Sequence, residues 1–421
     1  MEFMARFSRR RRISVLGLAV VAVAGVVMLP SGADETDDKA RVSKRGCTLS
    51  IPYRSGSGGY ASYRIPAVVR TRTGALLAFA EGRVGGREDS GDIDVVVRRS
   101  RDGGCTWGPL QVVAAGRGDT RGNPAPVVDP RTGAIVLVTS YNSGEVTEEQ
   151  ILTGETADEE SRRVFVQTSQ DEGRSFSEPR EITSAVKRAN WRWYATGPGH
   201  AVALTRGEHA GRLVVPANHS AAPSARSGDT GQEPKCYGAH AIYSDDSGRS
   251  WHLGFVDDAY EGSVNANESA AAQLPDGRLY FSARNQRGTS PGNRLDAYSD
   301  DDGASLDRPY AVQPTLSDVP MVQGSVLQLT AEERGELLFS GPSVPSGRVA
   351  MALWSSADGG RSFRKVLTLS SRKAGYSDLV QLDDRTVGIL YETGDNGPYE
   401  EIAFHRIPVW SLGGNGARSS Q

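Results

Sequence analysis

The chain has 421 residues, enough to bury a large core, and its 48 basic and 51 acidic residues nearly cancel to a net charge of −3. Because no basic face stands out, we expect no nucleic acid partner. The 49 glycines and the scarcity of long helix-period runs predict many turns and short strands. All-β domains often exceed the usual domain size, so one large β domain is compatible with this length.

The first 33 residues have the pattern of a signal peptide. Four consecutive arginines, Arg9 to Arg12, precede an apolar run from Ile13 to Leu29, and residues 31–33 are small, as cleavage requires. We therefore predict a signal peptide over 1–33, secretion, a polar disordered leader over 34–45 and no stable membrane association after cleavage. A single membrane anchor is the alternative, because 17 apolar residues lie at the short limit for a spanning helix. The general and twin-arginine export routes both fit.

Three cysteines are too few for a disulfide-built fold, and their odd number leaves at least one unpaired. A bridge between Cys47 and Cys105 is one possibility after export. Neither the cysteines nor the histidines have metal-ligand spacing, so no metal or cofactor is expected.

A motif of the form Ser-x-Asp-x-Gly-x-Ser/Thr followed by an aromatic residue occurs five times. An Asp side chain accepts hydrogen bonds from turn amides and a Gly adopts positive φ, so each copy predicts a hairpin turn. The fourth copy has Leu306 at the aromatic position. The copies occupy residues 100–107, 169–176, 244–251, 299–306 and 356–363.

Apolar runs precede the motifs and extended runs follow them, which predicts a strand, a turn and a strand around each copy. The copies are separated by 69, 75, 55 and 57 residues, about one small antiparallel sheet each. Five sheets with motifs, and material for one more, predict an all-β, six-bladed β-propeller, which leaves few exposed edges. Only the insert 147–162 has a helical pattern. We expect one domain over 46–411 and a disordered tail over 412–421.

Tyr63-Arg64-Ile65-Pro66, followed by the five motifs, resembles the bacterial secreted exo-α-sialidases (neuraminidases), which remove terminal sialic acid. The resemblance covers nearly the whole chain after the signal peptide. Motifs of this kind also occur in propellers without enzymatic activity, so the arginine motif makes the resemblance specific. Further segments that carry it are residues 80–83, 89–94, 122–124, 194–199, 282–284 and 389–392.

The resemblance implies a set of arginines that binds the substrate carboxylate. A guanidinium suits this task because it engages a carboxylate in a bidentate manner and stays charged. By motif these arginines are Arg64, Arg284 and Arg348, and Arg83 corresponds to a fourth arginine that contacts substrate. Glu392 corresponds to the glutamate that orients the first arginine, although an ordinary acid at a strand edge is the competing interpretation.

The resemblance also places a tyrosine nucleophile at Tyr376 and its base at Glu268. A neutral tyrosine can approach the anomeric carbon beside the substrate carboxylate, which would repel a carboxylate nucleophile. Its hydroxyl, with an ordinary pKa of about 10, then needs a nearby base. Gly375 and the polar residues after Tyr376 suggest that it lies at the end of a loop.

The acid/base has more than one candidate. The family aspartate lies on a flexible loop after the Glu-Gly-Arg motif, where it protonates the leaving oxygen and later activates water. Asp89, Asp92 and Asp94 compete for this role, and we select Asp89 with Asp92 as the alternative.

Together these residues predict hydrolysis with retention through a covalent tyrosyl intermediate. The expected substrates are sialylated glycoproteins, glycolipids or oligosaccharides, and a monomer is expected. The alternatives are an intramolecular trans-sialidase, a hydrolase for deaminated sialic acid, or a non-catalytic binding module. Trp191, Trp193 and Tyr194 are interpreted equally well as a pocket lining for the substrate N-acetyl group or as core.

Overall fold

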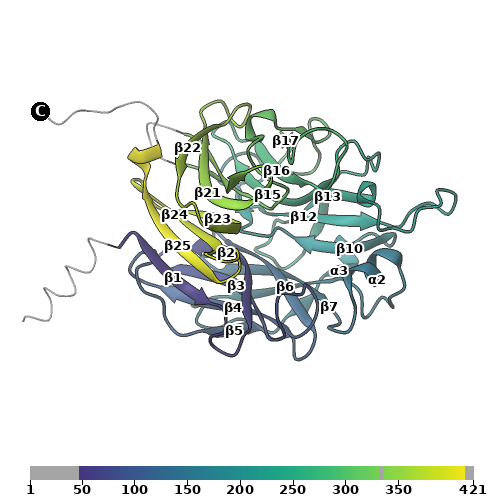
Figure 1. Cartoon of the computed structure of the whole chain (residues 1–421), viewed down its shortest axis with the longest axis horizontal. Coiled ribbons are helices and arrows are strands. Elements are labelled where there is room, and N and C mark those ends of the chain that lie inside the picture. Colours follow the sequence, from purple (N-terminus) through teal and green to yellow (C-terminus); the bar gives the residue numbers. More distant parts are fainter. Residues whose placement is uncertain (1–46, 331–334, 413–421) are drawn as a thin grey trace, which may run out of the picture. The chain divides into compact units, whose positions relative to one another are not determined.

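A computed structural model describes residues 47–330 and 335–412 of the chain, and the fold in these residues is all-β (Figure 1). These described residues all belong to one compact unit. The predicted signal peptide and leader lie outside the described residues. Within the described part, no helix is long and apolar enough to cross a membrane.

Residues 62–181 contain the strands of one eight-stranded sheet. A single parallel pair, Ile93 with Thr120, joins β4 to β6, and the other strand pairs in this sheet are antiparallel. The sheet therefore divides into two antiparallel groups, β2–β5 and β6–β9. Its strands are β2 (Ser62–Arg70), β3 (Leu76–Arg83), β4 (Ile93–Ser100), β5 (Gln111–Ala114), β6 (Thr120–Val128), β7 (Ile135–Asn142), β8 (Arg163–Ser169) and β9 (Arg180–Glu181).

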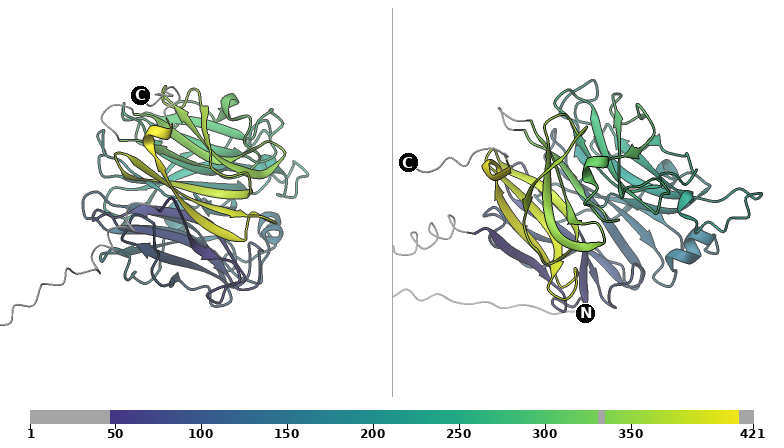
Figure 2. Two further views of the ribbon diagram at one scale, coloured as in Figure 1. Left: turned by 60° about the vertical axis from the view of Figure 1, so that its left-hand side comes forward. Right: turned by 45° about the horizontal axis from the view of Figure 1, so that its top comes forward.

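The last part of the unit forms a second eight-stranded sheet, which also divides at one pair, Val349 with Lys373. The N-terminal strand β1 pairs with β25, so it completes the group built by the C-terminal strands; in the right-hand view of Figure 2 the purple strand lies beside the yellow ones. The strands are β1 (Leu49–Arg54), β19 (Ser325–Gln328), β20 (Leu337–Val344), β21 (Gly347–Ser356), β22 (Arg364–Thr368), β23 (Lys373–Asp383), β24 (Thr386–Gly394) and β25 (Glu401–Pro408).

Two smaller antiparallel sheets lie between these in the sequence. The five-stranded sheet contains β10 (Trp191–Thr196), β11 (Val202–Ala203), β12 (Leu213–Ala221), β13 (Tyr237–Ser244) and β14 (His252–Val256). The four-stranded sheet contains β15 (Ala266–Gln273), β16 (Leu279–Asn285), β17 (Arg294–Ser299) and β18 (Ala311–Val312). The short helices are α2 (Glu148–Thr153), α3 (Thr183–Val186), η1 (Pro234–Cys236), η2 (Pro314–Leu316) and η3 (Val409–Leu412).

Strands of successive groups contact one another in a closed order. β2 contacts β6, β6 contacts β10, β12 contacts β15, β15 contacts β19, β19 contacts β23, and β23 returns to β2. Asp378 holds part of this centre: its buried carboxylate accepts hydrogen bonds from Val68 N in β2, His200 N after β10 and Ser325 Oγ in β19, all at 2.8–2.9 Å. One side chain thus fixes elements that are up to 310 residues apart in the sequence.

The core fills the space between neighbouring groups. Val136 and Val166 pack with Val215 between the β6–β8 and β12–β13 layers, and Val68 packs with Phe404 between β2–β4 and β23–β25. Burial of each such side chain stabilises the fold by about 1.5–3 kcal/mol. β-branched and aromatic residues suit these pleated layers, which explains why the apolar runs form strands.

The five predicted turns are confirmed, and their side chains make the same bonds. In the first copy, Gly104 N donates to Ser100 Oγ at 2.8 Å, and Thr106 N and Oγ1 donate to the two Asp102 oxygens at 2.9 and 2.7 Å. Gly104 has φ +88°, and a Cβ there would overlap Phe404, so this position requires glycine. Leu306 packs beside the core in the fourth copy, as the aromatic residues do elsewhere.

The predicted helical pattern of the insert is confirmed by α2. Thr147 and Gln150 form a capping box at its start, and Gly154 ends it in the left-handed conformation. The domain boundary predicted at residue 412 is one residue early, because Leu412 is buried at the end of η3. The remaining residues of the predicted tail lie outside the described residues.

Candidate active site

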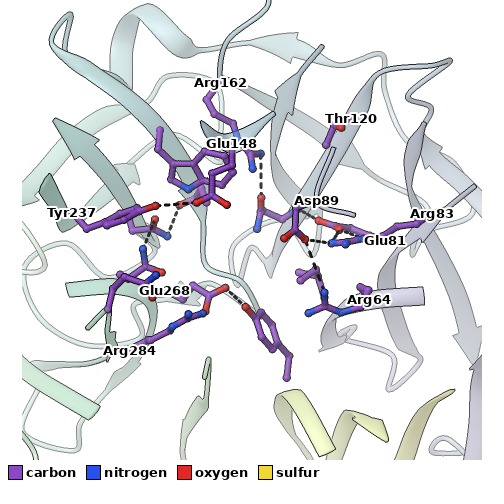
Figure 3. Close-up of a pocket in the computed structure, with 18 of the residues that line it drawn as sticks. Arg64, Glu81, Arg83, Asp89, Thr120, Glu148, Arg162, Tyr237, Glu268 and Arg284 are labelled. Atoms are coloured by element: carbon purple, nitrogen blue, oxygen red, sulfur yellow. Dashed lines mark hydrogen bonds and ion pairs between the residues drawn. The ribbon is translucent and has the colours of Figure 1, made fainter. Parts of the chain in front are cut away.

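A cavity with a volume of about 270 Å³ lies where residues from the different groups converge (Figure 3). The structure brings all eight predicted site residues together here. Seven of them line the cavity: Arg64, Arg83, Asp89, Glu268, Arg284, Arg348 and Tyr376. The eighth, Glu392, lies directly behind Arg64 and is fully buried.

Arg64 lies where strand β2 is irregular. The strand register shifts between Arg64 and Ala67, and Ile65 adopts φ +57° before Pro66. Arg64 Nε donates to Glu392 Oε1 at 2.9 Å, and Ile65 N donates to the same oxygen at 2.9 Å. Burial disfavours the charge of Arg64, but Glu392, together with Tyr399, Tyr376 and Asp89, outweighs it and raises the pKa of the guanidinium. Arg64 therefore stays positive while only 6% exposed.

The second oxygen of Glu392 fixes the backbone next to Tyr376. Tyr376 N donates to Glu392 Oε2 at 3.0 Å. A Cβ on Gly375 would overlap this carboxylate, so the glycine lets Glu392 reach both strands. Tyr376 was expected at a loop end, and this expectation is wrong: it lies inside β23, at a register shift between Ala374 and Ser377. This irregularity in the strand directs the Tyr376 side chain into the cavity, so no loop is needed to expose it.

Tyr376 and Glu268 form a direct hydrogen bond. The Tyr376 hydroxyl donates to Glu268 Oε1 at 2.5 Å, and Arg284 Nη1 donates to Glu268 Oε2 at 3.0 Å. Burial and Glu268 raise the pKa of Tyr376, while Arg284, Arg348 and Arg64 lower it. The tyrosine is thus neutral, with a carboxylate in place to accept its proton.

Three arginines surround the tyrosine. The guanidinium carbons of Arg64 and Arg348 lie 5.3 and 5.4 Å from the centre of its ring, and Arg284 reaches the site through Glu268. Arg348 Nη1 donates to Tyr399 Oη at 2.6 Å, and no described carboxylate lies within 4.0 Å of its guanidinium. Arg64 and Arg284 each pair with a glutamate, whereas Arg348 does not, so its positive charge makes this end of the cavity attractive for an anion.

Arg83 holds the loop that carries Asp89. Its guanidinium donates to Glu81 and also to the carbonyl oxygens of Arg87 and Glu88, at 2.6 and 2.8 Å. Asp89 is 60% exposed, 2.8 Å from Arg83 Nη2 and 3.9 Å from Arg64 Nη1. Burial opposes the charge of this carboxylate, but Arg83 and Arg64 prevail and lower its pKa.

The competing aspartates are engaged away from the cavity. Asp92 accepts from Gly118 N at 3.0 Å, and Asp94 accepts from Gly116 N at 2.7 Å and from Tyr60 Oη at 2.5 Å. Neither lines the cavity, whereas Asp89 does.

Sequence reasoning missed several residues of the cavity wall. Glu81, which pairs with Arg83, was within a quoted motif and was detectable from its position two residues before that arginine. Glu148, Arg162, Tyr237 and Tyr399 had no motif to mark them. Of the three aromatic residues left open, Trp193 lines the cavity, whereas Trp191 and Tyr194 belong to the core. Across residues 47–330 and 335–412, no group of three or more His, Cys, Asp or Glu side chains is arranged to hold a metal ion.

The chain is similar in sequence and in fold to several known proteins. Residues 74–390 match the BNR repeat-like domain family. The exo-alpha-sialidase of Aspergillus fumigatus is 30% identical over 403 residues, which cover 88% of this chain and 90% of the relative. Among solved structures, the Hadza microbial sialidase Hz136 is 26% identical with a TM-score of 0.73, over 87% of this chain and 69% of that chain. The intramolecular trans-sialidase from Ruminococcus gnavus shares the fold, with a TM-score of 0.72 at 18% identity, over 87% of this chain and 99% of that chain.

Proposed function

The chain belongs to the sialidase family, and from this premise we propose that it is an exo-α-sialidase that releases terminal sialic acids from glycoconjugates. Sialylated glycoproteins, glycolipids or oligosaccharides are its substrates. One observation carries the proposal: the Tyr376–Glu268 hydrogen bond lies among three arginines, at 2.5 Å between the two oxygens.

The arginines bind and orient the substrate. Arg64, Arg284 and Arg348 engage the carboxylate attached to the anomeric carbon, which places that carbon next to the Tyr376 hydroxyl. Because Glu392 fixes both Arg64 and the backbone of Tyr376, the binding group and the nucleophile keep a constant separation.

In the first chemical step, Tyr376 attacks the anomeric carbon and its proton passes to Glu268. The bond to the leaving oxygen breaks, and Asp89 gives that oxygen a proton. Asp89 has a lowered pKa in the free protein because of Arg83 and Arg64. The bound carboxylate partly neutralises Arg64, which raises the pKa of Asp89 and favours its acid form when substrate is present.

In the second step, Asp89 takes a proton from water, which attacks the anomeric carbon. The bond from carbon to Tyr376 breaks, and Glu268 returns the proton to the phenolate. Two displacements at one carbon leave its configuration retained.

The finer architecture that we propose is a six-bladed β-propeller. The single pairs Ile93–Thr120 and Val349–Lys373 support the division of each eight-stranded sheet into two blades. The closed order of contacts among β2, β6, β10, β12, β15, β19 and β23 supports a ring, with β1 completing the last blade.

We also propose that the protein is exported. The disulfide between Cys47 and Cys105 supports this, because such bonds persist mainly in oxidising compartments. N-terminal sequencing of protein recovered from the medium tests both export and cleavage after residue 33.

The proposed activity is tested with an aryl sialoside and two matched variants. Tyr376→Phe removes the nucleophilic oxygen and is expected to lower kcat/KM by roughly 10³-fold or more without unfolding the protein. Tyr194→Phe is the control, because this tyrosine is fully buried and its hydroxyl has no hydrogen-bond partner among the described residues. Near-normal turnover by Tyr376→Phe would refute the role of this residue, and an inactive wild-type protein would refute the activity.

A further inference from the structure

A second hollow, the Arg99 hollow, lies at the other end of the strands that carry part of the catalytic cavity. It has a volume of about 480 Å³ and shares no lining residue with that cavity. Arg83, which lines the cavity, pairs with Ile93 at one end of β3 and β4. Arg99, which lines the hollow, pairs with Leu77 at the other end. Six residues of extended strand separate Ile93 from Arg99, a span of roughly 20 Å.

The Arg99 hollow gathers three guanidinium groups from two of the repeated turns. Arg99 directly precedes the first turn, Arg101 is the second residue of that turn, and Arg174 is the sixth residue of the second turn. The side chains at these motif positions make none of the bonds that define the turns, so nothing in the turns requires arginine there. Gln111 Nε2, on β5, donates to Arg174 O at 3.1 Å and holds the second turn against this strand.

The three positive charges have little compensation. Arg99 Nη2 lies 3.9 Å from Glu172 Oε2, and no other carboxylate among the described residues lies within 4.0 Å of the three guanidinium groups. Nε and Nη2 of Arg99 are buried without a hydrogen-bond partner in the described part of the chain. Burial, Arg101 and Arg174 lower the pKa of Arg99, and the nearby acids offset this only in part. An anion in the hollow would relieve the repulsion and accept from the free donors.

A tryptophan ring stands between the Arg99 hollow and a neighbouring one. Trp107 Nε1 donates to Ser50 Oγ at 2.9 Å, and its ring packs edge to face on Phe404, with 5.4 Å between the ring centres. These contacts fix the orientation of the ring. Trp107 also lines the neighbouring hollow, which has a volume of about 310 Å³ and contains Arg54 and Arg98. Positively charged side chains therefore lie on both sides of one fixed aromatic ring.

This arrangement indicates the chemistry of a ligand. Two hollows that meet at an aromatic ring suit a chain better than a single small ion. Pyranose rings present C–H groups that pack on an aromatic face, and anionic substituents accept hydrogen bonds from arginine. A sulfate group offers three terminal oxygens to separate guanidinium groups, whereas a carboxylate offers two. A nucleic acid would need a longer positive track for its backbone than two adjacent hollows provide.

We propose that the Arg99 hollow and its neighbour across Trp107 form a binding site for a sulfated glycan, in which Arg99, Arg101 and Arg174 hold a sulfate group. The site is additional to the proposed sialidase activity and does not depend on it, because the two sites share no lining residue. A glycan bound at this end of the strands leaves the catalytic cavity open to substrate.

Calorimetric titration of the whole protein with three dextran oligosaccharides of equal length tests the site. One is sulfated, one is carboxymethylated and one is unmodified. At a salt concentration of about 0.15 M, where long-range attraction is screened, the sulfated chain is expected to bind ~10-fold or more tightly than the carboxymethylated chain. The unmodified chain should show no measurable binding, and inorganic sulfate at an equal sulfate concentration should compete poorly, because it makes no contact with Trp107.

Three substitutions examine the parts of the site. Arg101→Gln and Arg174→Gln change exposed side chains, and each is expected to weaken binding of the sulfated chain by ~10-fold, as for loss of a hydrogen bond to a charged group. Trp107→Leu tests the ring and should weaken binding several-fold. It is expected to fold, because Leu306 occupies the same motif position in the fourth turn.

A double variant controls for charge. Arg249 and Arg361 are exposed residues at the sixth position of the third and fifth turns, and neither lines the Arg99 hollow. Arg249→Gln with Arg361→Gln therefore removes two positive charges from equivalent turns and should bind the sulfated chain as the wild type does. Arg101→Gln with Arg174→Gln removes the same charge and should lose most of the binding. Thermal unfolding checks that all the variants are folded.

The outcomes separate the site from general attraction to anions and from the proposed function. Equal weakening in the two double variants, equal binding of the carboxymethylated chain, or full competition by inorganic sulfate would overturn the proposal. Tighter binding of a single-stranded oligonucleotide than of the sulfated chain would also overturn it. Turnover of an aryl sialoside should be unchanged in all these variants, and its absence in the wild type would refute the proposed function while leaving the binding result in place.

Discussion

Tyr399 contacts two of the three arginines that face the substrate carboxylate. Its ring lies 4.0 Å from the guanidinium carbon of Arg64, and its hydroxyl accepts a hydrogen bond from Arg348 at 2.6 Å. Both contacts restrict side chains that would otherwise lose rotamer freedom on binding. Tyr399 is therefore a positioning residue for the proposed binding site.

Replacement of Tyr399 with Phe separates these two contacts. The variant keeps the ring over Arg64 and removes only the acceptor for Arg348, so we expect KM to rise by roughly 3–10-fold while kcat changes little. Steady-state kinetics on an aryl sialoside provide the measurement, with Tyr194→Phe as the control. A fall in kcat at unchanged KM would show that Tyr399 acts in the chemical step instead.

At the residue scale, the sequence predicted the side chains that lie in short motifs on strands. Arg64, Glu268, Arg284, Arg348 and Tyr376 all reach the cavity from β2, β15, β16, β21 and β23. Tyr399, Glu148 and Arg162 were missed because they lie in connections, whose paths depend on tertiary contacts more than on local pattern.

At the element scale, the turns were predictable because their bonds are local. Each Asp in the repeated motif bonds groups no more than four residues away, so the pattern alone determines the turn. Strand β1 was not predicted, because Pro52 and the short run Leu49–Arg54 do not resemble a strand. It forms at a sheet edge, where proline is tolerated, and its register shifts between Ser50 and Tyr53. Its position depends on β25, about 350 residues away in the sequence.

The disulfide gives β1 a second attachment. Cys47, just before this strand, is bonded to Cys105 in the first repeated turn, and Cys236 is free and buried. The sequence left this pairing as one possibility, because cysteine spacing alone does not specify connectivity.

At the scale of the whole molecule, the closed order of strand contacts brings the residues of the site together. Residues from position 64 to position 399 meet in one cavity, and the buried carboxylate of Asp378 links strands of three different groups. A buried histidine pair affects stability: His219 and His240 are fully buried, with 3.1 Å between their Nδ1 atoms. Trp191 stacks on His219, whose Nε2 lies 2.7 Å from the Tyr260 hydroxyl.

These histidines predict loss of stability in mild acid. Burial lowers the pKa of His240 to about 3, and burial and His240 lower the pKa of His219, whereas both titrate near 6.5 in the unfolded chain. Below pH 6.5 the unfolded state therefore binds more protons, so this contribution to stability is present above pH 6.5 and is lost as the pH falls. Each histidine contributes a slope of up to about 1.4 kcal/mol per pH unit.

Urea unfolding at pH 7, 6 and 5 checks this prediction as a difference between variants, because other groups, such as Asp257, titrate in the same range. His240→Gln is expected to flatten the pH dependence of the unfolding free energy relative to wild type. His252→Gln, at an exposed position on β14, is the control and should not. Parallel pH profiles for wild type and His240→Gln would contradict the assignment.

The central claim is that Tyr376 becomes bonded to the anomeric carbon, and covalent trapping tests it most directly. A 3-fluorosialosyl fluoride slows both steps but keeps a leaving group that needs little acid assistance, so the intermediate should accumulate. Mass spectrometry of the digested protein is expected to find the sugar on the peptide that contains Tyr376, bound through the tyrosine oxygen. An adduct on Glu268, or no adduct in protein that hydrolyses the parent sialoside, would contradict the account.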